Sequence, residues 1–117
     1  MSVKKTNEPF WWGLFSAGGM IAAFVVPVLV LLTGFLAPLG SAPTALGYDH
    51  VYALLSNVVV KVALSGAVTL SLFHCAHRIR HTLVDVGIAG PEGVAAALCY
   101  LGAVAGGVCC GLALGAL

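Results

Sequence analysis

The chain has 117 residues, of which 61% are hydrophobic and only 8% are charged, and its mean hydropathy is +1.08. A water-soluble fold of this length would lack the polar residues needed to cover its surface, which excludes solubility in water. The formal net charge of +1 argues against nucleic-acid binding, because neutralising phosphates requires clustered Lys and Arg. The partners of the chain are therefore expected in the lipid bilayer.

The N-terminal part predicts a membrane-surface segment followed by a first span. We expect residues 1–12 to form a cytoplasmic or interfacial segment and residues 13–37 to form a transmembrane helix. Residues 9–48 contain no charge, whereas the apolar region of a cleavable signal peptide has only about 7–15 residues. The run is therefore a span and not a signal peptide. Pro27 lacks a backbone N–H and is expected to kink this helix.

Two further apolar runs predict transmembrane helices over residues 51–76 and 93–117, because a helix crosses the hydrocarbon core in about 20 residues. The runs show no alternation of polar and apolar residues, and three strands could not close a barrel. We therefore expect an all-α integral membrane protein whose three-helix anchor covers residues 13–117. Small residues recur in the third span at a spacing that permits close helix packing; they are Gly102, Gly106, Gly107, Gly111 and Gly115.

The positive charges predict the orientation of the spans. Lysine and arginine flank the N-terminus and the second loop, at Lys4, Lys5, Arg78 and Arg80. The first loop holds only Asp49 and His50. Since Lys and Arg are enriched on the cytoplasmic side, the N-terminus is expected inside and the C-terminus outside. This topology brings the start of the first helix and the basic end of the second helix to one membrane surface.

Several polar side chains of the second helix would share one narrow sector if that helix continued to residue 85. They are His74, His77, Arg78, His81 and Asp85. One interpretation is an interfacial cap that contacts lipid headgroups, and the other is a ligand-binding rim. The first and third spans contain no histidine and His50 lies near the opposite surface, so the chain cannot supply two axial haem ligands by itself.

Lys61 is the only charged residue within a span, and intramembrane charges are candidates for function. It lies close enough to the outer surface for its side chain to reach the headgroups. Asn57 is one turn away on the same face. Together they could form a distal polar patch, or both could pack against partner helices.

Trp11 and Trp12 stand at the start of the first span. An aromatic belt at the headgroup level explains both without a ligand. Alternatively, an indole offers one N–H donor and a flat apolar face, which would suit a quinone.

The four cysteines form no CxxC pair and lie in apolar stretches. Neither a zinc site nor a disulfide framework is indicated, and buried reduced thiols are expected.

Residues 7–20, with the sequence NEPFWWGLFSAGGM, closely resemble the opening of the D subunit of fumarate reductase. The pairs Pro27-Val28 and His77-Arg78 and the run Pro38-Leu39-Gly40 resemble landmarks of the same family, in the same order and spacing. The resemblance covers most of the chain and is weakest in the third span.

The resemblance implies a four-subunit complex of the bacterial inner membrane that serves anaerobic respiration. The flavoprotein, with FAD, reduces fumarate, the iron–sulfur protein carries the clusters, and two three-helix membrane anchors, the C and D subunits, bind menaquinol without haem. By motif, Trp12 resembles the tryptophan donor of the quinone site, and His77 with Arg78 resembles its basic rim. The region of Asn57 and Lys61 resembles the distal polar patch of the family only in character, because the residues differ.

Two other functions compete with this one. A haem-binding succinate dehydrogenase anchor has a similar architecture, but it depends on a histidine within the membrane core. A small proton-coupled transporter would usually need an intramembrane carboxylate, and no Asp or Glu lies within any expected span.

Overall fold

The computed structural model describes residues 6–88 and 92–117, and within them every regular element is helical. The elements are α1 (Glu8–Leu29), the π-helical η1 (Val30–Leu36), the 3-10 turn η2 (Thr44–Leu46), α2 (Tyr48–Ser56), α3 (Val58–Asp85) and α4 (Glu92–Gly115). Three helices are long and apolar enough to cross a membrane, namely Glu8–Leu36, Val58–Asp85 and Gly93–Gly115. The all-α class and the three spans are therefore confirmed.

The orientation of the termini stays a prediction. Two of the charges on which it rests, Lys4 and Lys5, lie outside the described residues.

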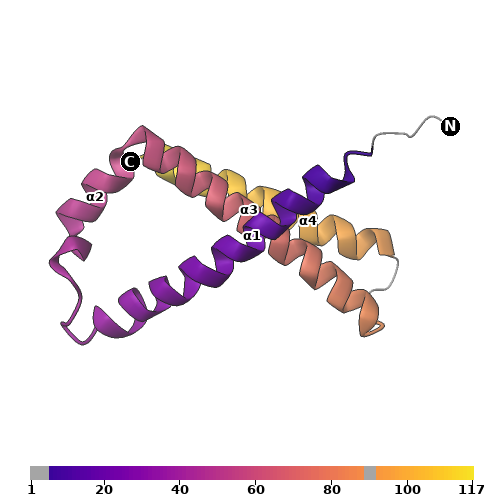
Figure 1. Ribbon diagram of the computed structural model, residues 1–117, viewed down its shortest axis with the longest axis horizontal. Coiled ribbons are helices and arrows are strands. Elements are labelled where there is room, and N and C mark those ends of the chain that lie inside the picture. Colours follow the sequence, from indigo (N-terminus) through magenta and orange to yellow (C-terminus); the bar gives the residue numbers. More distant parts are fainter. Residues whose placement is uncertain (1–5, 89–91) are drawn as a thin grey trace.

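The central helix is α3, which packs against both other spans. In Figure 1, α1 crosses in front of α3 near its middle, while α4 runs behind α3 in the opposite direction. The start of α1 and the end of α3 lie at one end of the molecule, and α2 lies at the other end. The alternating direction of the three spans thus brings the first turns of α1 close to the last turns of α3.

Two glycines allow α1 to cross α3 closely. Gly18 is buried, and a Cβ atom built there would collide with the backbone carbonyl oxygen of Leu70. A Cβ atom on Gly19 would lie 2.5 Å from Cε1 of His74. The Ser71 hydroxyl donates a hydrogen bond of 3.3 Å to the carbonyl oxygen of Gly18. Close backbone approach at small residues is a main source of helix association in membranes, so this glycine pair sets the crossing point.

The glycine series of α4 approaches α3 only at its centre. A Cβ atom on Gly106 would lie 2.9 Å from Cδ1 of Leu72, and one on Gly107 would lie 3.0 Å from Oγ1 of Thr69. Among residues 6–88 and 92–117, nothing packs within 4 Å of a Cβ position on the other glycines of the series, namely Gly102, Gly111 and Gly115. The expected close packing is therefore confirmed at the central pair alone.

The helix bounds differ from the expected spans. The first helix begins at Glu8 and not at residue 13, because Pro9 in its first turn has a preset φ and needs no hydrogen-bonded N–H there. The second helix continues to Asp85, which is the condition under which its polar side chains share one sector. Its start is interrupted at Asn57, where the extended backbone separates α2 from α3. Pro27 lies inside α1, and the helix changes to π geometry from Val30.

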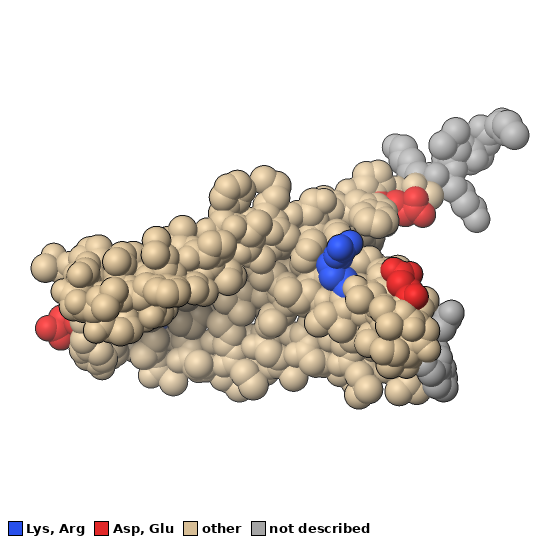
Figure 2. Space-filling view, turned by 90° about the horizontal axis from the view of Figure 1, so that it is seen from below, with Lys and Arg blue, Asp and Glu red and all other residues tan. Residues whose placement is uncertain are grey.

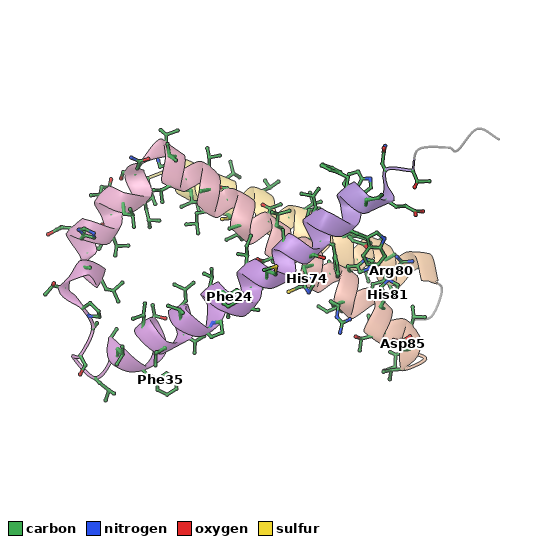
Figure 3. The ribbon with its side chains drawn as sticks, viewed as in Figure 1. Phe24, Phe35, His74, Arg80, His81 and Asp85 are labelled. Atoms are coloured by element: carbon green, nitrogen blue, oxygen red, sulfur yellow. The ribbon has the colours of Figure 1, made fainter. Side chains whose placement is uncertain are left out.

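Most of the surface is apolar. Phe24 and Phe35, on the part of the first span that diverges from α3, are 72% and 60% exposed (Figure 3). Figure 2 shows charged side chains towards the ends of the molecule and an uncharged surface between them. A surface of this kind is suited to lipid and to partner helices.

All four cysteines are free thiols, as expected. They are not all buried. Cys75 and Cys109 are exposed, because they lie on helix faces that no other described helix covers, while Cys99 and Cys110 are half-buried.

Candidate functional site

A cleft of about 410 Å³ lies where the start of α1 meets the end of α3, and α4 closes part of it. Its volume falls in the range of small-molecule sites, about 300–1,000 Å³. Six aromatic side chains from the three helices line it, namely Trp11, Trp12, Phe15, Phe73, His77 and Tyr100. The lining is therefore largely apolar, with polar atoms at a few positions.

The α1 wall consists of an aromatic pair one turn apart. Trp12 and Phe15 meet edge to face, with ring centroids 5.9 Å apart and planes at 88°. Both also approach the same imidazole of α3, since the His77 centroid lies 6.3 Å from Trp12 and 4.6 Å from Phe15. Trp12 is 60% exposed, so much of this residue remains free to contact a ligand. The expected meeting of Trp12 with His77 at one end of the molecule is confirmed.

The polar centre of the cleft is a hydrogen bond between α3 and α4. His77 Nδ1 lies 2.9 Å from the hydroxyl oxygen of Tyr100. Both side chains are half-buried, and Phe73 flanks Tyr100 at a centroid distance of 6.3 Å. An imidazole held in this way presents its second nitrogen, Nε2, on the opposite side of the ring.

His74, one turn earlier on α3, belongs to the helix crossing and not to the cleft lining. Its ring stacks on Phe15 at 4.3 Å, and its Nδ1 lies 3.0 Å from the backbone carbonyl oxygen of Phe15. A carbonyl can only accept, so Nδ1 of His74 carries the proton and donates. The ring also packs on Gly19 of α1.

The basic residues beyond His77 divide between the cleft and the surface. Arg78 is exposed and does not line the cleft, although His77 beside it does. The next turn carries His81, which is exposed and whose ring centroid lies 4.4 Å from that of His77. Figure 3 shows His74 near the helix crossing and His81 further along α3, towards Asp85.

The Asn57–Lys61 pair lies at the other end of α3. The Asn57 side-chain oxygen accepts hydrogen bonds from the N–H groups of Val59 and Val60, at 2.9 and 3.4 Å. Asn57 is thus the N-cap of α3. Lys61 is half-buried and lines a shallow groove with Gly111 and Gly115 of α4. Within residues 6–88 and 92–117, no hydrogen bond joins the Lys61 side chain to Asn57.

The structure adds site residues that the sequence patterns did not single out. Phe15 lies one turn after Trp12 on the same helix face, and that spacing could have indicated it. Tyr100 is the only tyrosine of the third apolar run, where a phenol hydroxyl needs a partner. Glu8, in the first turn of α1, adds a carboxylate to the lining.

The chemistry of the cleft suits a flat aromatic molecule with oxygen substituents. The aromatic walls offer apolar contact to a ring, and the indole of Trp12 and the imidazole of His77 offer hydrogen bonds. No group of three metal-ligating side chains occurs among the described residues.

Comparison with known proteins identifies one family. The family model for the D subunit of fumarate reductase matches residues 2–114. The fumarate reductase D subunit of Shewanella putrefaciens is 43% identical over 104 residues, which cover 87% of this chain and 84% of that protein. The D subunit of Mycobacterium tuberculosis is 46% identical over 84 residues, with 70% and 65% covered, and that of Vibrio cholerae is 37% identical over 92 residues, with 74% and 71% covered.

Proposed function

Because the chain belongs to the family of fumarate reductase D subunits, whose members are membrane anchors, we propose that it forms part of a quinol:fumarate reductase and contributes one wall of its menaquinol site. In this proposal it holds the flavoprotein and the iron–sulfur protein at the bacterial inner membrane, together with the second membrane anchor, the C subunit. FAD and the iron–sulfur clusters belong to the partner subunits. This chain carries out no fumarate chemistry.

One observation carries the quinol part of the proposal. Trp12, His77 and Tyr100 come from three different helices and line the same aromatic cleft. A menaquinol headgroup is a flat bicyclic ring with two oxygens, so it needs apolar faces and a small number of hydrogen bonds. The Trp12 N–H can donate to one oxygen of the ring, while His77 can exchange a proton with it.

The cleft is only part of a site. Trp12 is 60% exposed, and Trp11, which also lines the cleft, is 65% exposed. The remaining walls therefore come from partner subunits in this proposal. Electrons from menaquinol pass to the iron–sulfur protein, and its protons leave at the cytoplasmic surface.

The packing of His74 supports an anchor without haem. His74 is the histidine deepest in the helix crossing, and its ring is stacked on Phe15 with Gly19 close to three of its atoms. An axial ligand needs an open space large enough for a porphyrin beside Nε2. The α1 helix passes close to this part of the ring, since a Cβ atom on Gly19 would lie only 3.0 Å from Nε2.

The proposal is tested in membranes in which this chain is expressed with the three partner subunits. Menaquinol-dependent fumarate reduction is compared with fumarate reduction by a reduced artificial dye, which delivers electrons without the quinol site. Trp12→Leu and His77→Ala are expected to lower the quinol-dependent rate and to leave the dye-dependent rate intact.

Matched controls are Phe24→Leu, an aromatic residue further along the first span, and His50→Ala, a histidine at the other end of the molecule. Both should retain the quinol-dependent rate. If Trp12→Leu and His77→Ala also retain it, the quinol site is wrongly assigned. Loss of both activities would instead indicate that the complex no longer assembles.

A further inference from the structure

Two histidines one turn apart on α3 have hydrogen-bond partners of different chemistry. The partner of His74 Nδ1 is the backbone carbonyl oxygen of Phe15, at 3.0 Å. Because a carbonyl only accepts, this bond survives only while Nδ1 carries a proton. His74 is thereby held in one orientation, between the stacked ring of Phe15 and the backbone at Gly19.

The partner of His77 Nδ1 is the hydroxyl of Tyr100, at 2.9 Å. A phenol hydroxyl can donate and accept. When Nδ1 has no proton, the Tyr100 O–H donates to it, and when Nδ1 has a proton, the Tyr100 oxygen accepts from it. The same contact can therefore persist in every protonation state of His77. Within residues 6–88 and 92–117, Nε2 of His77 makes no hydrogen bond, so it is available to a ligand.

We infer that Tyr100 is the positioning residue that allows His77, and not His74, to exchange a proton with the quinol. This inference rests on the proposed function. Tyr100 holds the imidazole from the α4 side and leaves Nε2 on the opposite side of the ring. His77 lines the cleft, whereas His74 does not.

Quinol oxidation at this arrangement releases electrons and protons to named acceptors. The quinol gives up two electrons, which pass to the iron–sulfur protein, and two protons. One proton passes from a quinol hydroxyl to Nε2 of His77, while Nδ1–H donates to the Tyr100 oxygen. The other proton leaves to water at the open side of the cleft. His77 then passes its Nε2 proton on towards the exposed His81, whose ring centroid is 4.4 Å away, and returns to the neutral form with its proton on Nδ1.

The same hydroxyl also supports the other neutral form of His77, which is reached when the imidazolium loses its Nδ1 proton instead of its Nε2 proton. With Tyr100 O–H donating to Nδ1, neutral His77 carries its proton on Nε2 and can donate to a quinone carbonyl. A side chain that could only accept a hydrogen bond would support only the form of His77 in which Nδ1 carries a proton. A residue without polar atoms would leave Nδ1 unpaired among aromatic side chains.

Tyr100→Phe tests the inference, since it removes the hydroxyl and keeps the ring that packs against Phe73. In the assembled complex we expect the menaquinol kcat to fall about 10–100-fold, by analogy with the loss of a hydrogen-bond partner that orients a metal-ligating histidine. The KM for menaquinol should stay within about twofold, because the aromatic walls are unchanged. The ratio of rates in H₂O and D₂O should rise, because proton transfer becomes slower relative to the other steps.

Tyr52→Phe is the matched control, since the Tyr52 hydroxyl bonds the carbonyl oxygen of Leu117 at the other end of the molecule. This variant should retain the parental kcat and isotope effect. In a second pair of variants, the same substitution is made separately at each of the two histidines. An asparagine amide can replace the Nδ1–H donor of His74 but cannot take up a proton, so His74→Asn should retain quinol turnover and His77→Asn should lose it.

The outcomes separate this inference from the proposed function. If Trp12→Leu and His77→Ala have no effect on quinol turnover, the proposed function fails. If they lower turnover while Tyr100→Phe retains the parental kcat, only the inference is overturned. Loss of dye-dependent activity in Tyr100→Phe would show that the hydroxyl is needed for assembly, which also overturns it. Equal loss of quinol turnover in His74→Asn and His77→Asn would contradict the inference that His77, and not His74, exchanges a proton with the quinol.

Discussion

Replacement of Gly18 by alanine tests how the helix crossing builds the site. Gly18 is buried, and its added Cβ would collide with a backbone oxygen of Leu70, which cannot move aside as a side chain can. Overpacking of this kind costs about 1–3 kcal/mol. Alanine recovers up to about 1 kcal/mol because it is a better helix former than glycine. We therefore expect a net loss of about 1–2 kcal/mol of stability, relieved in part by a shift of α1 away from α3.

The shift of α1 should change the geometry of the cleft, because α1 carries Trp12 and Phe15 within the two turns before Gly18. Their distances to His77, 6.3 and 4.6 Å between centroids, depend on the crossing. A displacement of about 1 Å in such a site can lower turnover by up to about 100-fold. Gly18→Ala is therefore expected to lower the menaquinol-dependent rate much more than the dye-dependent rate.

The assay combines thermal unfolding of the purified four-subunit complex with both activity measurements. Gly13→Ala is the matched control, because Gly13 lies on the same helix and no part of the chain that the structure describes packs within 4 Å of a Cβ there. This control should keep or slightly raise the unfolding temperature and retain quinol turnover. The reasoning is refuted if Gly18→Ala and Gly13→Ala behave alike in both measurements.

Three further predictions concern other parts of the chain. Gly107→Leu should reduce co-purification of the four subunits, because Thr69 lies 3.0 Å from the new Cβ. Gly111→Leu should disturb α3–α4 packing less, because no described residue packs within 4 Å of a Cβ there, and equal loss in the two variants would contradict this. Asn57→Ala should lower the stability of the purified complex by about 1 kcal/mol through loss of the N-cap, and Asn57→Asp should retain it, as thermal unfolding would measure. The reduced-minus-oxidised absorption spectrum of the complex should contain no b-type haem band, and a band abolished by His74→Ala would overturn the haem-free assignment.

Some site residues were predictable because their placement depends on chain direction alone. Spans of about 20 apolar residues alternate in direction, so the start of the first helix and the end of the second meet at one surface. Trp12 and His77 were expected there on this ground and are found there. Arg78, expected beside them, is exposed and lies outside the cleft lining. Adjacent residues on a helix point about 100° apart, and only packing shows which of them faces the neighbouring helix.

The sequence predicted the all-α class, the number of spans and the end of the molecule at which the candidate site lies. These follow from hydrophobicity and length, which are local properties of the chain. The tertiary structure alone decided how each helix is rotated towards its neighbours. Apart from the polar side chains near the end of α3, the spans are mostly apolar on every face, so hydrophobicity does not mark the packed side. Small residues such as Gly18 and Gly19 determine it through close contact. That rotation pairs His77 with Tyr100 and His74 with a backbone carbonyl, a difference that no sequence pattern shows.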